Sequence, residues 1–491
     1  MNFARDIVDA APPERVALIE LPREGARREH TFGEVADRSA RLAGTLRAHG
    51  VARGDVVLTL IGNRPEWVET MVACFRLGAV VLPCTEQLRA KDLRLRLDVA
   101  RPAVVVCDVR NRAVLDEALA LPTDVPAGTP LILDVPDPAL YDAPPAPAVE
   151  LSPSDPCLIT FTSGTSGEPK AVLHAQRYLD GQQVQAQHWL GGGPGDIVWC
   201  TAASGWSKSA RNVFIAPWIR GATALLHDAR FDPTERLDLL ERERVNVLCM
   251  APTEYRVIAK RARLRPFPEL RGLVAAGEAL NPEVLHLWRE ATGLVIRDGY
   301  GQTETGQMTG IPGDADPSDV RPGSMGRPLP GVRLWIDDGE LVADPSTVPT
   351  FFLGYLGEEP HDRETPWRTG DRVHADEDGY LYFEGRTDDV IISAGYRIGP
   401  FEVESALVAH PAVAEAAVVA APDEERGSVV RAVIVLQEHA EASDALAREL
   451  QDHVKSETAP YKYPRIIEFT AALPKTSSGK IRRSLLRGGA A

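Results

Sequence analysis

Thr160-Phe-Thr-Ser-Gly-Thr-Ser-Gly-Glu-Pro-Lys170 is the most informative stretch of the chain. It places hydroxyl side chains, two glycines and a lysine directly after a predicted strand. Glycines let the backbone approach an anion and turn its N–H groups inward, while the hydroxyls and the lysine add donors and positive charge. The stretch therefore predicts a loop that binds a polyphosphate. It is not a Walker A loop, because its spacing is Gly-x-x-Gly-x-x-Lys without a following Ser or Thr, and a polar surface turn is the alternative.

A second stretch, Asp298-Gly-Tyr-Gly-Gln-Thr-Glu-Thr305, places an aromatic ring, hydroxyls and a carboxylate side by side. It nearly imitates a dinucleotide fingerprint, but the third glycine would fall at Glu304, which disfavours a Rossmann site. Tyr300 can stack on a base, Thr303 can bond a phosphate and Glu304 can hold Mg²⁺. The pattern therefore suits a nucleotide, and a tight turn that closes a strand is the alternative.

Three further stretches carry weaker signals. In Trp367-Arg-Thr-Gly-Asp371 the aspartate suits either an Asx turn or the hydroxyls of a ribose. The run from Glu384 to Ile398 has charged residues before an apolar strand and a glycine turn, as a plain domain boundary would. The basic run Leu473-Pro-Lys-Thr-Ser-Ser-Gly-Lys-Ile-Arg-Arg483 predicts an exposed, flexible C-terminal loop, with a solvated tail as the alternative.

Composition narrows the class of protein. The 491 residues are 44% hydrophobic and 25% charged, as in a globular protein too long for one core. A net charge of −16 disfavours nucleic acids and anionic membranes as partners, so a nucleotide site must supply its own positive charge. The six cysteines lack metal-binding spacing, and we expect them to be buried thiols of a cytoplasmic protein. We expect neither an export signal nor a segment that spans a membrane.

Alternating helix and strand signals predict parallel sheets with helices on their faces. Thr31 and Glu34 form a capping-box pattern at the start of a helix, and Gly50 is placed to end it. The Pro- and Asp-rich stretch 121–156 predicts a loosely structured connection. The remaining elements follow the same alternation, with strands at 56–61, 79–82, 103–107, 245–250 and 273–276 and a helix at 67–76.

The character of the chain changes after Gly385. Helices at 401–408 and 445–456 separate predicted strands at 390–393, 416–420 and 432–436. This pattern predicts a small α+β domain behind a hinge. We therefore expect two domains, 1–386 and 387–491.

Taken together, in this order and at these separations, the motifs resemble the acyl-adenylating superfamily, which includes acyl-CoA synthetases, peptide-synthetase adenylation domains and luciferases. The likeness covers nearly the whole chain. The phrases that look most like the medium-chain acyl-CoA synthetase branch are Gly205-Trp-Ser-Lys-Ser-Ala210, Pro252-Thr-Glu-Tyr-Arg256, Gly299-Tyr-Gly-Gln-Thr-Glu304, Ser393-Ala-Gly-Tyr-Arg-Ile-Gly-Pro-Phe-Glu-Val-Glu404 and Thr458-Ala-Pro-Tyr-Lys-Tyr-Pro-Arg465. The resemblance implies an α/β fold, in which a large N-terminal domain of parallel α/β sheets and a β-rich subdomain binds ATP and the acid. A small mobile C-terminal α+β domain would rotate between two half-reactions.

The resemblance also implies roles for particular residues. Lys480 would be the catalytic lysine of the first half-reaction, beside Thr303 and Glu304, with Glu304 placing Mg²⁺. Trp206 would line the acyl pocket, and Asp388 would be the hinge residue. The ATP and AMP contacts would be Thr162, Ser163, Gly164, Thr165, Ser166, Gly167, Glu168, Pro169 and Lys170, then Gly277, Glu278, Ala279, Asp298, Gly299, Tyr300, Gly301, Gln302 and Thr303, and finally Asp371, Arg386, Arg397 and Lys480. The CoA contacts would be Ala394, Gly395, Tyr396, Arg426, Lys455, Tyr463, Pro464 and Arg465.

The implied activity is that of an AMP-forming acyl-CoA synthetase, an acid–thiol ligase. A carboxylic acid and ATP give an acyl-adenylate and pyrophosphate, and CoA then gives acyl-CoA and AMP, so ATP, Mg²⁺ and CoA are the implied cofactors and cosubstrates. A medium-chain fatty acid is the first expectation, ahead of benzoate-like or branched acids and then acetate or propionate. Loading of a carrier protein, release of acyl-AMP, and a non-catalytic nucleotide or acyl sensor are the alternatives. Whether the protein forms a homodimer is left open.

The segment 331–360 departs from the family pattern. Members usually carry a longer β-rich stretch with a Gly-Glu-x-Gly-Glu-Ile phrase, which this chain shortens to Asp337-Asp-Gly-Glu-Leu341. The shortening leaves undecided whether the β-rich subdomain forms, and it removes no catalytic position. The chain also lacks a Gly-x-Ser-x-Gly elbow, in agreement with chemistry that needs no protein nucleophile.

Overall fold

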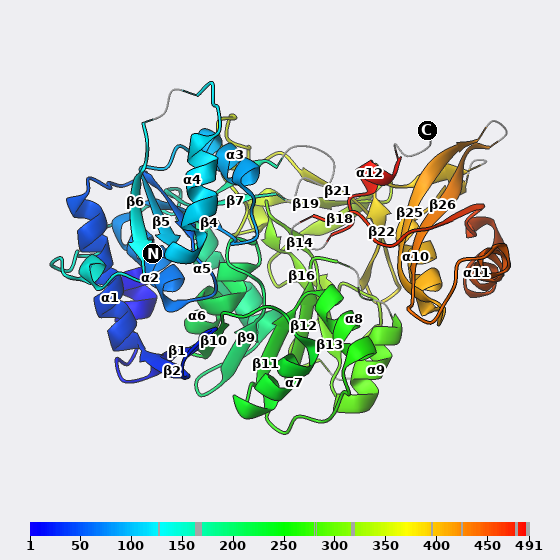
Figure 1. Ribbon diagram of the computed structural model, residues 1–491, viewed down its shortest axis with the longest axis horizontal. Coiled ribbons are helices and arrows are strands. Elements are labelled where there is room, and N and C mark those ends of the chain that lie inside the picture. Colours follow the sequence, from blue (N-terminus) through cyan, green and yellow to red (C-terminus); the bar gives the residue numbers. More distant parts are fainter. Residues whose placement is uncertain are drawn as a thin grey trace.

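The computed structural model describes residues 1–125, 128–162, 169–278, 280, 282–315, 320–393, 396–423, 426–476 and 480–487, with only the backbone of Arg397. Figure 1 shows a large body, blue to yellow, with a smaller C-terminal lobe, orange and red, beside it. Within the described ranges, no helix is long and apolar enough to cross a membrane.

One sheet of the large body has the strand order β20-β8-β7-β4-β3-β5-β6. Its centre is parallel, and β7, β8 and β20 pair antiparallel at one end. Helices on both faces bury these strands, which explains their continuous apolar runs. The strands are β3 (Val56–Leu60), β4 (Val80–Cys84), β5 (Val104–Asp108), β6 (Leu131–Val135), β7 (Pro156–Phe161), β8 (Ala171–Ala175) and β20 (Gly354–Tyr355).

A second sheet has the order β13-β12-β11-β9-β10-β1-β2 and is parallel except for β2. Gly277 follows β12 and Tyr300 follows β13, so both lie where neighbouring parallel strands end at one edge of the sheet. Ligands of open α/β sheets bind at this edge. The strands are β1 (Val16–Leu21), β2 (Arg28–Thr31), β9 (Ile197–Cys200), β10 (Thr223–His227), β11 (Val247–Met250), β12 (Gly272–Ala276) and β13 (Ile296–Gly299).

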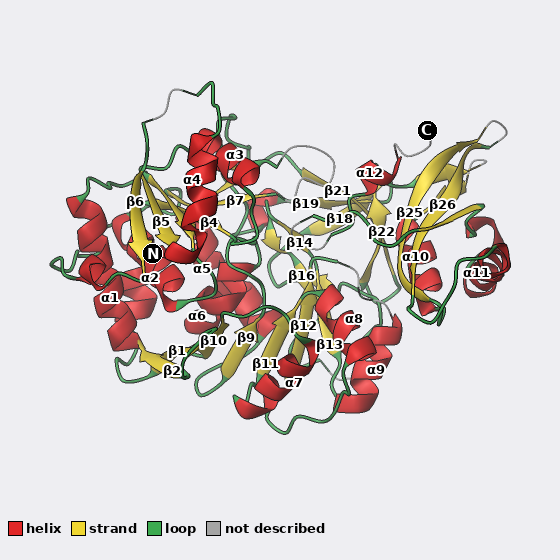
Figure 2. Cartoon of the chain, viewed as in Figure 1, coloured by secondary structure: helices red, strands yellow, loops and turns green. Residues whose placement is uncertain are grey.

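Helices surround the two sheets (Figure 2). The predicted capping box is confirmed, because Glu34 N donates to Thr31 Oγ1 at 3.2 Å and Thr31 N donates to Glu34 Oε2 at 2.7 Å. The helices of the large body are α1 (Phe32–Ala48), α2 (Pro65–Leu77), α3 (Ala90–Ala100), α4 (Arg112–Ala120), α5 (Gln176–Gln185), α6 (Ala216–Ile219), α7 (Pro233–Arg242), α8 (Pro252–Arg261) and α9 (Pro282–Thr292).

The expectation that 121–156 is a loosely structured connection is wrong in one part. Strand β6 lies inside this stretch and pairs in parallel with β5 along its whole length. Leu133 and Val135 of this strand are buried. The edge of β5 has backbone groups that need partners, and this short apolar run supplies them although its surroundings are rich in proline.

The shortened segment 331–360 still builds the β-rich subdomain. Strands β18 (Leu334–Asp337) and β19 (Glu340–Ala343) form a hairpin whose turn residues Asp338 and Gly339 have φ of 48° and 77°. Positive φ at both turn positions matches the twist of a two-residue hairpin. The hairpin forms a four-stranded sheet with β21 (Trp367–Ala375) and β22 (Leu381–Arg386), in the order β18-β19-β21-β22. Two short two-stranded sheets precede it in the sequence, namely β14 (Gly301–Gln302) with β15 (Gly306–Gln307) and β16 (Thr309–Gly310) with β17 (Arg327–Pro328).

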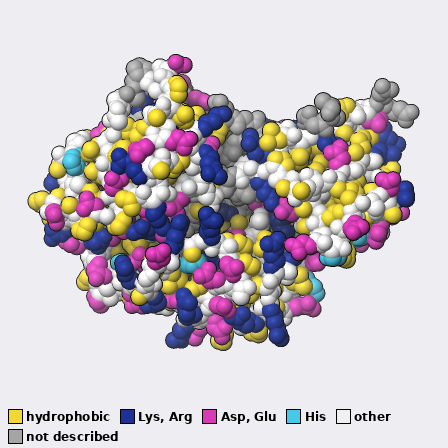
Figure 3. Space-filling view, viewed as in Figure 1, with side chains coloured by type: hydrophobic (Ala, Val, Ile, Leu, Met, Phe, Trp, Pro, Cys, Tyr) yellow, Lys and Arg dark blue, Asp and Glu magenta, His cyan; other side chains and the backbone are white. Residues whose placement is uncertain are grey.

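The C-terminal lobe has its own apolar core, which includes Ile391, Val403, Val418 and Leu450. Figure 3 shows the visible face of the protein hollowed where this lobe meets the large body. The position of the boundary between residues 386 and 387 stays a prediction. The elements of the lobe are β23 (Ile391–Ser393), β24 (Tyr396–Ile398), α10 (Pro400–Ala409), β25 (Val413–Asp423), β26 (Gly427–Leu436), α11 (Asp444–Glu457), β27 (Ile466–Phe469) and α12 (Arg483–Arg487).

Candidate active site

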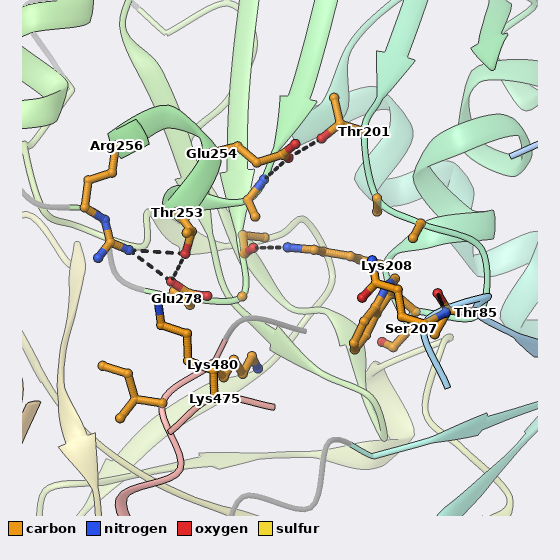
Figure 4. Close-up of a pocket in the computed structure, with 18 of the residues that line it drawn as sticks. Thr85, Thr201, Ser207, Lys208, Thr253, Glu254, Arg256, Glu278, Lys475 and Lys480 are labelled. Carbon is orange, nitrogen blue, oxygen red and sulfur yellow. Dashed lines mark hydrogen bonds and ion pairs between the residues drawn. The ribbon is translucent and has the colours of Figure 1, made fainter. Parts of the chain in front are cut away.

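A cleft of about 1930 Å³ lies between the large body and the C-terminal lobe. Both sheets contribute to its wall through the loops at their strand ends, and the lobe closes it from the other side. The cleft brings together residues predicted from distant motifs, namely Thr162, Pro169, Lys170, Trp206, Gly277, Glu278, Asp298, Gly299, Tyr300, Gly301, Gln302, Thr303, Glu304, Asp371, Arg386, Asp388 and Lys480. Figure 4 shows part of this wall.

The predicted phosphate loop is closed at its base. Thr162 N donates to Lys170 O at 2.9 Å, and Lys170 N donates to Thr162 Oγ1 at 2.9 Å. Lys170 Nζ lies 4.3 Å from the centroid of the Tyr355 ring and 3.7 Å from a carboxylate oxygen of Glu358. The intervening residues Ser163–Glu168, and Ala279 of the adenine stretch, lie outside the described residues.

Asp371 is the centre of a buried polar network. Its carboxylate accepts hydrogen bonds from the Tyr300 hydroxyl, from Gln302 Nε2 at 2.9 Å and from Arg386 Nη1 at 3.2 Å. The pairing of β21 with β22 sets Asp371 directly opposite Arg386. Burial raises the pKa of Asp371, and the Arg386 guanidinium opposes that rise. The network joins the second and third sequence motifs around one carboxylate, and it holds the ring of Tyr300 by its hydroxyl.

Glu304 lies on the wall of the cleft, tied by its backbone and one carboxylate oxygen. Its Oε1 accepts from the Tyr355 hydroxyl at 2.9 Å, and its carbonyl accepts from Phe352 N at 2.8 Å. Among the described residues, no three His, Cys, Asp or Glu side chains group as ligands for a metal. Since Mg²⁺ usually keeps one or two carboxylate ligands together with substrate phosphates, a single glutamate fits that ion.

Glu278 is held by residues of α8 to which the sequence motifs assigned no role. Its Oε2 accepts from Thr253 Oγ1 at 2.9 Å and from Arg256 Nη2 at 3.1 Å. Figure 4 shows the Lys480 side chain reaching toward this carboxylate. The phrase Pro252–Arg256 stood out only by its resemblance, because its partner Glu278 is distant in sequence.

The C-terminal stretch is not the exposed loop that its basic composition predicted. Lys480 N donates to Thr476 Oγ1 at 3.1 Å and Thr476 N donates to Lys480 O at 2.8 Å, which ties these two residues together. Buried Leu473 packs on Ala417 and Val433 and anchors the stretch to the lobe. The Lys480 side chain therefore enters the cleft, where burial lowers its pKa although the carboxylates of Glu278 and Asp371 favour the charged form.

Of the predicted CoA residues, those that the structure describes do not line the cleft with Lys480. Tyr396 is 53% exposed and stacks on Tyr461 with ring centroids 4.4 Å apart. Lys455 and Arg465 lie over the Tyr463 ring at 4.5 and 5.0 Å, and Pro464 O accepts from Gln451 Nε2. Arg426 N donates to Asp423, while Ala394 and Gly395 lie outside the described residues. Arg397, which was predicted to contact the nucleotide, pairs through its backbone with Ile392.

Gly205, beside the predicted acyl-pocket residue Trp206, lets the backbone pass close to Thr85 at the end of β4. Gly205 has a φ of 88°, and a Cβ there would lie 2.4 Å from Thr85 N. We expect Gly205→Ala to lower the free energy of unfolding by about 2–4 kcal/mol, from the backbone strain and from the overlap. Denaturant unfolding measures this change. Gly195→Ala is the control, because Gly195 has a φ of 89° with no atom nearby. Equal losses for both variants would contradict the close approach at Gly205.

Comparison with known proteins shows the family. A model described as AMP-binding enzyme matches residues 6–349, and one described as AMP-binding enzyme C-terminal domain matches 402–480. The chain is 39% identical over 503 residues to the uncharacterized acyl-CoA ligase YtcI of Bacillus subtilis (strain 168), covering 97% of this chain and 94% of that one. It is 37% identical over 526 residues to the mitochondrial acyl-coenzyme A synthetase ACSM3 of Mus musculus, covering 99% and 90%. The solved anthranilate CoA ligase AuaEII in complex with anthranoyl-AMP matches with a TM-score of 0.87 and 29% identity, over 98% of this chain and 96% of that one.

The chain therefore belongs to the AMP-binding enzyme family. Within that family it is an acyl-CoA ligase of the AMP-forming kind. The expected fold class, with parallel sheets, a β-rich subdomain and a C-terminal α+β domain, is confirmed. The acid, the metal, the roles of single residues and the cytoplasmic location stay predictions.

Proposed function

We propose that the protein activates a carboxylic acid with ATP and then transfers the acyl group to CoA. The cleft supports this proposal, because Thr162, Lys170, the Asp371–Arg386 pair and Lys480 all line one space. A carboxylate is a poor acyl donor, since its leaving group would be oxide. The adenylate provides AMP as a good leaving group, so no protein nucleophile is needed.

Each part of the cleft has a task in the first half-reaction. The hydrogen bonds between Thr162 and Lys170 hold the two ends of the predicted phosphate loop together. The Asp371 carboxylate has oxygens that can accept hydrogen bonds from ribose hydroxyls. The Lys480 ammonium neutralises charge that develops as the acid attacks the α-phosphorus, in a site where burial strengthens the interaction. Mg²⁺ on the ATP phosphates would take Glu304 as a ligand and would supply further neutralisation.

The second half-reaction needs CoA to reach the same adenylate. Of the predicted CoA residues, Tyr396 and Arg465 are exposed on the lobe. Tyr396 stacks on Tyr461, and Lys455 and Arg465 lie over the Tyr463 ring, which gives the lobe an aromatic and basic face. Rotation of the lobe at Asp388 would withdraw Lys480 and bring that face to the cleft. Asp388 suits a hinge, because its side chain is 51% exposed and the ion pair it makes within the described part of the chain is a 3.5 Å contact to Arg386.

A medium-chain fatty acid is the first candidate for the acid, on the resemblance of the sequence to that branch. Benzoate-like acids are the second candidate, and the similarity to an anthranilate CoA ligase favours them. Acetate and propionate come next. The pocket beside Trp206 decides among them.

Thioester formation by the purified protein, with ATP, Mg²⁺ and CoA, tests the proposal across acids from acetate to laurate together with benzoate. We expect thioester with AMP and pyrophosphate as co-products. Acid-dependent pyrophosphate release without thioester would move the acceptor to a carrier protein or to none. Binding of ATP without turnover of any acid would favour the sensor.

A further inference from the structure

Arg211 is a buried arginine without a counter-ion on the wall of the cleft. Its side chain belongs to the π-helical turn Arg211–Ile215, it is 5% exposed, and it lines the cleft. Its Nε and Nη1 find no hydrogen-bond acceptor among the described residues. No carboxylate of the described ranges lies within 4.0 Å of it, whereas most arginines of this protein have such a partner.

A lone buried guanidinium is unfavourable for the folded protein. Burying a charge without a partner costs several kcal/mol, so buried arginines are normally paired with carboxylates or phosphates. Arginine also remains charged at any physiological pH, and therefore cannot escape this cost by losing its proton. A residue that lowers stability in this way, beside an active site, indicates a ligand that carries the missing negative charge.

The position of Arg211 points to the acid and not to ATP. It lies in the same segment as Trp206 and Lys208, on the side of the cleft where β11 ends, and its charge acts on His174, Tyr178 and Cys249. Arg211 is thus on the part of the cleft wall that carries the predicted acyl-pocket residue Trp206.

The neighbours of Arg211 do not neutralise it. Burial lowers the pKa of His174 to about 3 and raises the pKa of Tyr178, so both are neutral at pH 7. Lys208 adds a second cation, whose Nζ donates to Ala276 O at 2.9 Å (Figure 4). Asp298, an acid on which the charge of Lys208 acts, has a pKa that burial raises to about 8, so it is mostly protonated at pH 7. Arg211 and Lys208 thus bring two cations to this wall of the cleft, in a protein whose overall charge is −16.

We propose that Arg211 is a specificity-determining residue that binds a second carboxylate on the substrate, so that the enzyme activates one end of a dicarboxylic acid. This inference rests on the proposed function and names its substrate class. One carboxylate attacks the α-phosphorus and pyrophosphate leaves, while the other stays ionised and pairs with the Arg211 guanidinium. A diacid of medium chain length would agree with the resemblance to the medium-chain branch and would supply the negative charge that Arg211 lacks.

Matched acids test the inference directly. We compare kcat/KM for succinate, glutarate, adipate, pimelate and suberate with kcat/KM for their monomethyl esters, which keep one free carboxylate and lose the distal charge. We expect one diacid to exceed its ester by about 100-fold, the effect of leaving a buried charge unpaired. This comparison uses the wild-type protein and does not depend on any variant.

Variants then assign the preference to Arg211. We expect Arg211→Met to abolish the preference for the diacid, Arg211→Lys to keep part of it, and the exposed rim variant Arg230→Met to keep it in full. We also expect Arg211→Met to raise the melting temperature by roughly 2–4 °C, because it removes a buried unpaired charge. The diacid should raise the melting temperature of the wild type but not of Arg211→Met.

Different failures have different meanings. Thioester from monocarboxylates or esters at rates equal to or above every diacid would overturn this inference and leave the proposed function intact. Equal losses for diacid and ester in Arg211→Met would also overturn it, because Arg211 would then hold the reacting carboxylate or the fold. Failure of every acid to give thioester would overturn the proposed function and this inference with it.

Discussion

Replacement of Lys480 by alanine is expected to slow adenylate formation by about 10²–10³-fold, because it removes a preorganised charge at the reacting phosphorus. Acid-dependent exchange of pyrophosphate into ATP measures this half-reaction. Thioester formation from preformed acyl-AMP measures the other, and we expect it to change little, since the lobe that carries Lys480 would have turned away. The two assays therefore separate the role of Lys480 from a general loss of structure.

Lys475→Ala is the matched control for this prediction. Lys475 lies on the same C-terminal stretch, and its Nζ pairs with Glu415 at 2.6 Å in a partly exposed ion pair. Such pairs contribute little to stability, so exchange should stay within about threefold of the wild type. If Lys480→Ala slowed both half-reactions equally, Lys480 would be a structural residue of the lobe.

The pH dependence of exchange should also reflect the position of Lys480. Burial lowers its pKa below the usual range for lysine, so the charged form is lost at a lower pH than for an exposed lysine. Because the charged form is the active one, we expect the exchange rate to fall as pH rises through this lowered pKa. This alkaline fall should be absent in the residual activity of Lys480→Ala.

Asp371→Asn is expected to lower kcat/KM in both half-reactions by about 10²–10³-fold. The substitution removes the charge that pairs with Arg386 and replaces an acceptor of the Tyr300 and Gln302 hydrogen bonds with a donor. Truncating one partner of a buried charge pair costs about 2–5 kcal/mol, and both half-reactions use the same adenylate. Pyrophosphate exchange and the acyl-AMP assay should therefore fall together, unlike in Lys480→Ala.

Asp376→Asn provides the same chemical change outside the cleft. Asp376 accepts hydrogen bonds from the backbone of the β21–β22 turn, at 2.8 Å from Tyr380 N. We expect activity within about twofold of the wild type, as for most surface substitutions. Unchanged exchange in Asp371→Asn would contradict the role of the network in holding the nucleotide.

The order of elements could be predicted because it depends on local signals. The Thr31–Glu34 capping box and the 3.6-residue periodicity of α1 need only neighbours along the chain. Strand β6 was missed, because its place is decided by the free edge of β5 and not by its own proline-rich surroundings. The shortened β18–β19 hairpin was left open for the same reason, since its partner β21 lies beyond a long connection.

The residue types of the site could be predicted, but their contacts could not. The chemistry requires particular residue types, and these are visible as motifs in the sequence: the glycine-rich loop, Asp371, Arg386 and Lys480. The contact of Tyr300 with Asp371 joins positions 71 residues apart, and no pattern along the chain indicates it. The composition of the C-terminal stretch predicted an exposed loop, and the buried anchor of Leu473 instead directs Lys480 into the cleft.

The sequence by itself determined the fold class, the family resemblance and the kind of chemistry, because these depend on periodicity and on the spacing of reactive groups. Only the tertiary structure decided which charges are paired. Arg211 and Arg386 have the same chemistry in the sequence. Arg386 faces Asp371, whereas Arg211 is buried with no carboxylate partner among the described residues. Charge pairing is a matter of distances of a few ångströms between elements far apart along the chain, and those distances exist only once the sheets and the lobe have packed.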